Sequence, residues 1–567
     1  MNLLMTSEIS VPRGSWIRFN LASGGCWYGH GFSHRQPYPL NAEAIVNTRF
    51  AVNNIQSPIW MCSEGYAFLI DTTESLEVRC NEQGDGWLRI MCSETAVTVR
   101  VFQGKSLPEA HGQLMKHLHW PPPCPEARMF GDSIFCTWTQ HPRAVLQGRV
   151  LEMAKAIRQH GFPCSMLTID DRWESVFGEL TFSDDFPDPA GMVRELHEMG
   201  FSVLLWTTPF VNQEAASYRE LAERGWLAPR YDGSGPALLK WWGGTAGIVD
   251  ITNPEAKEWY RTRLLRLMDE IGVDGFKIDG GDAKYMPEPS ITAWHRNVGP
   301  SGYVDLYLSL YEEVAPGKCE SRTAWLSQGR NILWREGGKD SHWGVDNGLK
   351  AMVNLGLHLA LLGYDTLIPD MIPGRVQTMD ANTPLPSDEL FVRWVEASAL
   401  MPLMQFSYYP WNYAETTSSI ARQYALLHKS LEDYLVEQAF NRSAPLLRPL
   451  WYDNPDEADF YSIDDEFLLG NDLLVAPVLE EYQVARDIFL PSGNWRDAWT
   501  GELIQEKHLL QYPAPCPGIP IFVRAERKDL LQKIRTALDG IKKGGILSST
   551  KSATYSSGLN RDISVTG

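Results

Sequence analysis

Two aspartates in the middle of the chain have the surroundings that glycoside hydrolysis requires. Asp279 ends the apolar run 275–279 and precedes two glycines, which allow a sharp turn and close approach of a sugar. Asp340 lies in a loop with two glycines and an aromatic residue nearby. Cleavage needs one ionised carboxylate that attacks the sugar and one acid that protonates the leaving oxygen, roughly 5 Å apart in retaining enzymes. We therefore predict Asp279 as the nucleophile and Asp340 as the acid/base.

Other charged residues also follow predicted strands and are expected near this pair. The strand-end acids are Asp170, Asp171, Asp279, Asp282, Asp340 and Asp370. Lys277 shares the strand face of Asp279, where it can keep that carboxylate ionised or bind a hydroxyl; a salt bridge inside the barrel is the alternative. Arg322 can bind a carboxylate and a hydroxyl together, with a buried ion pair as its alternative. For Asp171 and Asp282 the alternative is a helix cap.

Short apolar runs alternating with helical segments over residues 126–440 predict the elements that position these side chains. Alternation of this kind is typical of βα units, and eight of them close into a (β/α)8 barrel, an α/β fold with its catalytic groups at the carboxyl ends of the strands. A helix preceding the second strand is indicated by the apolar spacing of Val150, Met153, Ala154 and Ile157. The predicted strands are 130–137, 165–170, 202–207, 275–279, 318–322, an irregular one near Ser341, 366–370 and 403–407.

Both flanks of the barrel have the pattern of β-domains. Residues 1–120 contain short alternating runs separated by turn residues, which predict a small N-terminal β-sandwich. The proline-rich stretch 119–125 predicts a linker, because proline lacks the backbone donor that a helix or central strand needs. Residues 441–530 predict a C-terminal β-sandwich domain. Residues 531–567 are interpreted as a tail, and we expect its end, rich in Ser, Thr and Gly, to be disordered.

Composition excludes several other classes of protein. The net charge of −19 argues against nucleic-acid binding, which relies on clustered Lys and Arg, whereas a neutral small carbohydrate fits. The nine cysteines form no C-x-x-C pair, so we expect no metal and no cofactor; a disulfide such as Cys80–Cys92 stays open. The chain start lacks the pattern of a signal peptide and no run predicts a membrane segment, which favours the cytoplasm. A homo-oligomer is an open possibility.

The motifs together resemble glycoside hydrolase family 31 over roughly residues 125–525. They are Ile169-Asp-Asp-Arg-Trp173, Gly275-Phe-Lys-Ile-Asp279, Ser321-Arg322, Lys339-Asp-Ser-His-Trp343, Arg393-Trp394, Arg448-Pro-Leu-Trp451 and Leu473-Leu-Val-Ala-Pro477. Within the family, the branch of the myogenesis-regulating glycosidase is the most similar, judged by Trp27-Tyr-Gly29, Trp206 to Asn212, Trp241-Trp-Gly-Gly-Thr-Ala-Gly247, Pro369-Asp-Met371 and Gln405-Phe-Ser407.

The resemblance implies roles for individual residues. It makes Asp279 the nucleophile that forms a glycosyl ester, Asp340 the acid/base and Asp170 a ligand of the outer sugar hydroxyls. Arg322 becomes a sugar contact near the nucleophile. The full set of substrate-binding residues expected on this basis is Asp170, Asp171, Trp206, Lys277, Arg322, Trp343, Asp370 and Trp138.

The resemblance also implies an α-linked substrate and an α-configured product. The branch favours α-galactosides, while α-glucosidases, α-xylosidases, sulfoquinovosidases and transglycosylases are alternatives within the family, and a non-catalytic sugar-binding protein is the alternative outside it. Two departures stand out. The N-terminal domain is shorter than is usual in the family, and Asp282 stands where relatives carry a nearby Glu, which leaves its role open.

Overall fold

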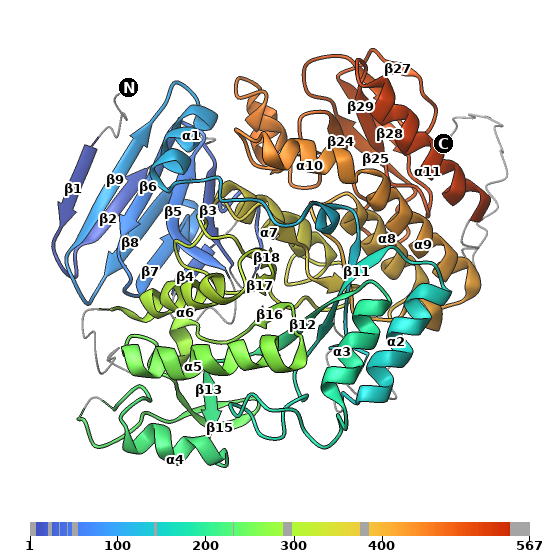
Figure 1. Cartoon of the computed structure of the whole chain (residues 1–567). Helices are drawn as coiled ribbons and strands as arrows, with labels where there is room; N and C mark the ends of the chain where they lie inside the picture. The colour runs from blue at the N-terminus through green and yellow to red at the C-terminus, as the bar shows by residue number, and fades with distance from the viewer. Residues whose placement is uncertain are drawn as a thin grey trace, which may run out of the picture.

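The protein is built as a central barrel with a β-domain on either side, as the computed structural model shows (Figure 1). The N-terminal β-domain, blue in the figure, lies on one side of the barrel, and the C-terminal one, orange to red, lies on another. The structure describes residues 7–20, 25–32, 35–41, 44–47, 55–140, 145–230, 232–286, 298–374 and 385–544. The predicted end of the tail, 545–567, lies outside these residues.

The N-terminal domain is an antiparallel β-sandwich, as predicted. One sheet has the order β1 (Ser7–Val11), β9 (Val97–Gln103), β6 (Tyr66–Asp71), β5 (Gln56–Cys62), β3 (Trp27–Gly31), and the other β2 (Trp16–Asn20), β8 (Trp87–Cys92), β7 (Leu76–Cys80), β4 (Ala44–Asn47). Residues alternate between buried and partly exposed along β7 and β8. Side chains from both sheets, including Trp27, Trp60, Leu88 and Ile90, share one apolar core. All nine cysteines are free thiols, so Cys80 and Cys92 form no disulfide.

The sandwich is joined to the barrel by a tryptophan. Trp325 follows the fifth barrel strand by four residues, yet its side chain is buried in the core of the sandwich. Its indole Nε1 donates to the carbonyl of Thr72 at 2.9 Å, and Ala324 pairs in parallel with Ile55. The loop that carries Arg322 is therefore held from outside the barrel. Helix α1 (Leu107–His117) then leads from the sandwich toward the linker.

The barrel consists of parallel strands with helices around them (Figure 1). In order around the sheet they are β19 (Leu367–Ile368), β18 (Leu333–Arg335), β17 (Cys319–Ser321), β16 (Gly275–Ile278), β12 (Ser202–Thr207), β11 (Cys164–Ile169), β10 (Ser133–Cys136), β21 (Gln405–Phe406) and β20 (Met371–Ile372). The helices are α2 (Gln147–Gln159), α3 (Pro189–Glu198), α5 (Pro254–Arg266), α6 (Pro300–Val314), α7 (Leu349–Leu361), α8 (Asp388–Ala399), α9 (Glu415–Ser430) and α10 (Glu432–Phe440). On α2 the predicted residues Val150, Met153, Ala154 and Ile157 form the buried face.

The seventh strand is broken, and the break closes the barrel. Its first half, β19, pairs with β18, and its second half, β20, pairs with β21 on the other side. Asp370 lies between the halves with a left-handed φ of 69°. This conformation is uncommon for a residue with a side chain, although Asp tolerates it better than most. Because of this turn, β19 and β20 pair with two different strands, β18 and β21.

The sixth strand differs from the prediction. The sequence predicted an irregular strand near Ser341, and the structure has β18 at Leu333–Arg335 instead. The stretch around Ser341 is the loop that follows this strand. The prediction was wrong because β18 is only three residues long and ends in a buried arginine, so the apolar run that marks it, residues 332–334, is short.

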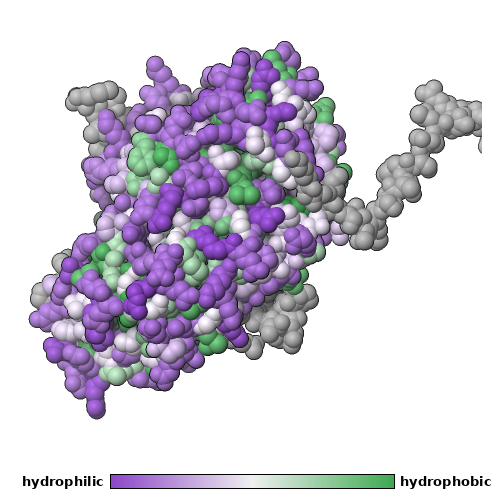
Figure 2. All heavy atoms as spheres, turned by 45° about the vertical axis from the view of Figure 1, so that its right-hand side comes forward, coloured by the Kyte–Doolittle hydropathy of each residue, from purple (hydrophilic) through white to green (hydrophobic). Residues whose placement is uncertain are grey.

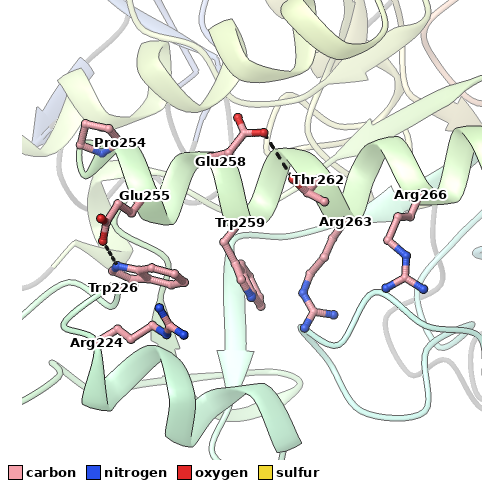
Figure 3. A pocket seen from close by; sticks show the side chains of 9 residues that line it. All are labelled: Arg224, Trp226, Pro254, Glu255, Glu258, Trp259, Thr262, Arg263 and Arg266. Atoms are coloured by element: carbon pink, nitrogen blue, oxygen red, sulfur yellow. Dashed lines mark hydrogen bonds between the residues drawn. The ribbon is translucent and has the colours of Figure 1, made fainter.

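A small antiparallel sheet follows the third barrel strand. It consists of β13 (Phe210–Asn212), β15 (Gly244–Ile248) and β14 (Leu239–Trp241), with α4 (Ala216–Glu223) beside it. We call the segment that contains β13, α4, β14 and β15 the excursion. A groove with a volume of about 680 Å³ lies between the excursion and α5. Figure 3 shows the side chains that line it. There Arg224 stacks on Trp226 at 4.6 Å and Arg263 on Trp259 at 4.3 Å from the ring centres. The indole Nε1 of Trp226 donates to Oε2 of Glu255 on α5 at 3.2 Å, and this bond connects the excursion to the barrel.

A buried glutamate shapes the loop after the second strand. Oε2 of Glu174 accepts hydrogen bonds from the backbone N–H of Gly178 at 3.0 Å and of Leu180 at 2.8 Å. Burial raises the pKa of Glu174 to about 8, although these backbone donors oppose the effect. The loop holds Phe177, whose ring lies 5.7 Å from that of Trp206 at the carboxyl end of the barrel.

The C-terminal domain is also mainly β-structure. Its larger sheet has the order β22 (Leu447–Arg448), β23 (Phe467–Leu469), β24 (Leu473–Val475), β29 (Ile521–Arg524), β26 (Trp495–Asp497), β27 (Leu503–Ile504), and β25 (Ala485–Phe489) pairs with β28 (His508–Pro513). Residues 531–544, which the sequence analysis assigned to the tail, belong to α11 (Lys528–Gly544). This helix buries Leu530, Ile534, Leu538 and Ile541 and contacts α9.

The surface is mainly hydrophilic on the face that Figure 2 shows, with only small, separate hydrophobic patches. Among the helices within the described residues, none is both long enough and apolar enough to cross a lipid bilayer.

We expect Gly275→Ala to destabilise the barrel. A Cβ at Gly275 would lie 1.8 Å from the backbone carbonyl of Lys318 on the neighbouring chain segment, which a side-chain rotation cannot relieve. Overpacking of this kind costs about 1–3 kcal/mol or more, so the Tm in thermal unfolding should fall clearly. Gly112→Ala is the control, because nothing lies within 4 Å of its Cβ position in the interior of α1; that change should leave the Tm unchanged or slightly raised. Equal Tm values for the two variants would contradict the close packing of Gly275 against Lys318.

Glu174→Gln should change how stability depends on pH. The folded-state pKa of Glu174 is raised to about 8, so the stability it contributes is complete below its ordinary pKa of about 4.3 and is lost as pH rises through about 8. Glutamine does not ionise, so its contribution to stability stays the same over this pH range. The Tm of the wild type, measured from pH 4 to 9, should therefore fall relative to that of the variant. Glu198→Gln, at an exposed position of α3, is the control. Parallel curves for wild type and Glu174→Gln would refute the expectation.

Candidate active site

The strand-end residues that the sequence singled out meet at one end of the barrel. Asp170 and Asp171 follow β11, Asp279 follows β16, and Arg322 follows β17. Because the strands are parallel, their carboxyl ends share one face of the barrel. Asp340 reaches this end from the loop after β18. The carboxyl end of the barrel is therefore the candidate active site.

Asp279 is a buried carboxylate with donors on both oxygens. Arg322 binds it with a fork: Nε lies 2.9 Å from Oδ1, and Nη2 lies 2.7 and 2.8 Å from Oδ1 and Oδ2. The indole Nε1 of Trp206 donates to Oδ2 at 2.9 Å, and the N–H of Gly280 donates to Oδ1 at 2.8 Å. A bidentate arginine compensates the negative charge and fixes the plane of the carboxylate. Arg322 and Trp206 thus contact Asp279 directly.

Glycine is required directly after Asp279. Gly280 has a φ of 67°, and a Cβ there would lie 2.8 Å from both the ring of Phe210 and the hydroxyl of Thr208. A side chain would therefore be strained by its backbone conformation and by its neighbours. The sharp turn that the sequence predicted is present.

Lys277 pairs with Asp170, at 2.6 Å, rather than with Asp279. It also donates to the Sγ of Cys136 at 3.3 Å and lies 3.6 Å from Glu320. The contact observed is thus the barrel-interior salt bridge that the sequence left as the alternative. Burial alone would raise the pKa of Asp170, but the charge of Lys277 outweighs it and the pKa is lowered. The same contact raises the pKa of Lys277 against the effect of burial.

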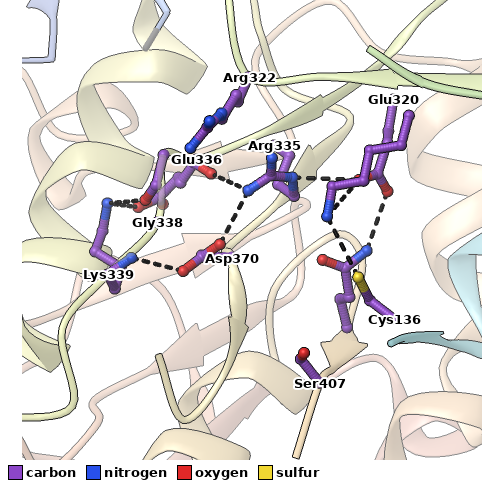
Figure 4. A network of polar contacts seen from close by, with 12 residues as sticks. Cys136, Glu320, Arg322, Arg335, Glu336, Gly338, Lys339, Asp370 and Ser407 are labelled. Carbon is purple, nitrogen blue, oxygen red and sulfur yellow. Dashed lines mark hydrogen bonds and ion pairs between the residues drawn. The ribbon is translucent and has the colours of Figure 1, made fainter. Parts of the chain in front are cut away.

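A buried chain of charged groups continues from this pair to the loop of Asp340 (Figure 4). Glu320 pairs with Arg335 at 3.2 Å, and Arg335 pairs with Asp370 at 3.1 Å. Oδ2 of Asp370 accepts the backbone N–H of Lys339 at 2.7 Å, and the ammonium of Lys339 lies 3.0 Å from Glu336. Asp370 therefore holds the backbone of the residue before Asp340.

Two more carboxyls of the site are buried with raised pKa values. The pKa of Asp171 is raised to about 8, first by burial and then by the charges of Asp170 and Asp279. Burial also raises the pKa of Asp282 to about 7, and the charge of Asp279 adds to this while Arg322 opposes it. Asp282 does precede a short 3-10 helix, Ala283–Tyr285, but makes no side-chain cap there. Near neutral pH both groups can donate a proton to a hydrogen bond.

A group of aromatic rings extends from Trp206, which contacts Asp279, and most of them were not among the predicted site residues. Trp206 is parallel to Trp241 with ring centres 6.4 Å apart, and Trp242 lies 6.5 Å from Trp206. Trp242 is 41% exposed, which leaves a face for a ligand. Tyr285 lies 6.5 Å from Trp242. The two adjacent tryptophans of the excursion were the available signal, but only the fold brings them to Asp279.

The remaining predicted residues lie around the same end. Trp138 lies two residues beyond the end of β10 and is partly buried. Trp343 is partly buried and packs on the main apolar core. Asp340 is partly exposed, and its Oδ2 accepts a hydrogen bond from Asn347 at 3.0 Å. Asn347 was not predicted, since it lies seven positions further along the loop from Asp340.

The arrangement provides a carboxylate held by an arginine and a second, more accessible carboxyl. It also provides several carboxyl groups that can bind sugar hydroxyls, and an exposed indole face. These are the groups that sugar binding and glycosidic cleavage use. Within the part of the chain that the structure describes, no three His, Cys, Asp or Glu side chains are placed to hold a metal ion.

Comparisons with known proteins agree with this geometry. Residues 122–438 match the TIM-barrel domain of glycosyl hydrolases family 31, residues 443–527 its C-terminal domain, and residues 12–112 the N-terminal domain of the myogenesis-regulating glycosidase. The myogenesis-regulating glycosidase of Mus musculus is 33% identical over 517 residues, which cover 87% of this chain and 72% of that protein. The 1,3-α-isomaltosidase of Kribbella flavida is 29% identical over 382 residues, 62% of this chain and 51% of that protein.

Solved structures show the same fold. A family 31 sulfoquinovosidase from E. rectale, in complex with an aza-sugar inhibitor, superposes with a TM-score of 0.77 at 20% identity, over 92% of this chain and 84% of that one. A family 31 α-xylosidase from a soil metagenome, complexed with xylose, gives 0.78 at 22% identity, over 92% and 80%. From the family matches and the mouse relative together, this chain belongs to glycoside hydrolase family 31, whose members are glycosidases.

Proposed function

We propose that this protein is a retaining α-glycosidase in which Asp279 is the nucleophile and Asp340 the acid/base. The observation that carries the proposal is the position of Asp279, buried at the end of β16 and bound by Arg322 and Trp206 at the barrel end to which Asp340 also belongs. The family matches support the class of reaction.

The mechanism has two displacements. In the first, Asp279 attacks the anomeric carbon while Asp340 gives its proton to the departing oxygen, and a glycosyl ester of inverted configuration forms. In the second, Asp340 takes a proton from water, and this water displaces Asp279 with a second inversion. The product thus keeps the configuration of the substrate. Arg322 can compensate the charge of Asp279 before attack and after release.

The substrate class we propose is a terminal α-linked sugar, with α-galactosides as the first candidate. Relatives include α-xylosidases, a sulfoquinovosidase and an isomaltosidase, which supports an α-linkage. The galactose preference rests on the resemblance described in the sequence analysis. We assign Asp170 and Asp171 to the sugar hydroxyls, and Trp242 to the stacking of an apolar sugar face. Trp138, Trp343 and Asp370 stay predictions as substrate contacts; Lys277 acts through Asp170.

Hydrolysis of a panel of nitrophenyl α-glycosides by wild type and Asp279→Ala tests the proposal. Loss of the nucleophile should lower the rate by about 1000-fold or more, because no glycosyl ester can form. Azide should restore activity to the variant and give a β-glycosyl azide, since a single displacement inverts the configuration.

Asp269→Ala, which removes an exposed carboxylate outside the barrel mouth, is the control and should keep wild-type activity. Cleavage of the α-galactoside by the wild type would support galactose as the sugar that the enzyme recognises. Cleavage of a different glycoside of the panel would identify that sugar instead. Longer oligosaccharides among the products would indicate a transglycosylase, to which similarity with an isomaltosyltransferase also points. Wild-type activity in Asp279→Ala would refute the assignment of the nucleophile.

A further inference from the structure

Asn347 makes two contacts to the segment that carries Asp340. Its backbone carbonyl accepts the N–H of Asp340 at 2.9 Å. Its side-chain Nδ2 donates to Oδ2 of Asp340 at 3.0 Å and to the carbonyl of Gly338 at 2.9 Å. The loop thus returns on itself, with one residue binding both the backbone and the carboxyl group of Asp340.

Chemistry fixes the orientation of this amide. Both partners of the side-chain group, the Asp340 carboxyl oxygen and the Gly338 carbonyl, are acceptors, so the NH2 end must face them and both of its protons are used. A flipped amide would place its oxygen against two other oxygens. Asn347 is therefore a donor to Asp340.

Two local costs accompany this contact. Asn347 has a φ of 87°, in the left-handed region, and its Oδ1 is buried without a hydrogen-bond partner among the described residues. Each feature is unfavourable for folding, although Asn is among the residues that tolerate the conformation best. Such costs are typical of positions held for function.

The loop has tethers other than this amide. The N–H of Lys339 donates to Asp370, and the hydroxyl of Ser341 donates to the carbonyl of Pro373 at 2.9 Å. The side chain of Lys339 is fully buried. Both neighbours of Asp340 are thus tethered elsewhere, whereas the carboxyl group of Asp340 receives a hydrogen bond from the Asn347 side chain.

We propose that Asn347 is a positioning residue for the acid/base, an inference that rests on the role of Asp340 in the proposed function. The hydrogen bond from Asn347 to Oδ2 favours Oδ1 as the oxygen that carries the acidic proton of Asp340. In the first displacement the Oδ1–H bond breaks, the proton moves to the glycosidic oxygen, the C–O bond to the leaving group breaks, and the bond from Asp279 forms. The carboxylate that remains keeps its hydrogen bond from Asn347, and hydrogen bonds to charged groups are stronger than those to neutral ones.

Asn347→Gly tests the inference, since glycine accepts the positive φ and retains the backbone carbonyl. The measurement is kcat/KM for a phenyl and a 2,4-dinitrophenyl glycoside of the sugar that the wild type cleaves. The phenyl compound needs a proton at its leaving oxygen and the dinitrophenyl compound does not. For the variant we expect a fall of about 10-fold with the phenyl compound and of less than about 2-fold with the other.

Ser341→Ala is the matched control, because it releases a tether of the same loop that does not touch the carboxyl group. Any change it causes should be similar for both compounds. Asp340→Ala should show the pattern of Asn347→Gly in stronger form. If Asn347→Gly does not fold, as judged by its Tm, Asn347→Leu replaces it and should give the same selective loss, because leucine has a similar volume and no donor.

Equal losses with both compounds, or no loss with either, would overturn the role of Asn347. A wild type that cleaves neither compound on any sugar of the panel would instead contradict the proposed function, so the two failures are distinguishable.

Discussion

The active site depends on pairing of charges inside the barrel. The chain that runs from Lys277 and Asp170 through Glu320 and Arg335 to Asp370 is almost completely removed from water. Removing one partner of a buried ion pair costs about 3–5 kcal/mol, because the other charge is left without compensation. The chain therefore fixes the relative positions of β11, β16, β17 and β18, of the turn between β19 and β20, and of the loop that follows β18. Asp170, proposed as a sugar ligand, and the loop of Asp340, proposed as the acid/base, share this support.

Charge is distributed unevenly among the carboxyls above this chain. Asp279 is compensated by the fork of Arg322, whereas burial and neighbouring charge raise the pKa of Asp171 to about 8 and that of Asp282 to about 7. Near neutral pH the pocket can thus offer both donors and acceptors to a ligand. A sugar ring presents hydroxyls that do both, so this mixture suits the substrate class proposed here. It also limits repulsion between acids that lie close together.

The sequence predicted those parts of the site that follow continuous apolar strands. β11, β12, β16 and β17 agree with the predicted runs within one or two residues, and Asp170, Asp279 and Arg322 lie where these strands end. The sixth strand was missed because its three residues include Arg335, a charged side chain that only the interior network makes favourable. Asn347 and Trp242 lie in loops and Trp241 ends the short strand β14. Their positions depend on tertiary contacts, and no local spacing relates them to Asp279 or Asp340. The apolar spacing of Leu530, Ile534, Leu538 and Ile541 is typical of an amphipathic helix, so α11 could have been predicted from the sequence.

The tryptophan that joins the sandwich to the barrel has a consequence for how the chain is divided. Trp325 fills the apolar core of the N-terminal sandwich, three residues beyond the arginine that binds Asp279. Three family models match three separate segments of the chain, which suggests modules that evolution can exchange. The physical boundary does not coincide with these segments, because the sandwich core is incomplete without a residue of the barrel. Recombination between relatives would therefore have to transfer this loop together with the sandwich, so the unit of inheritance is larger than the unit that sequence similarity outlines.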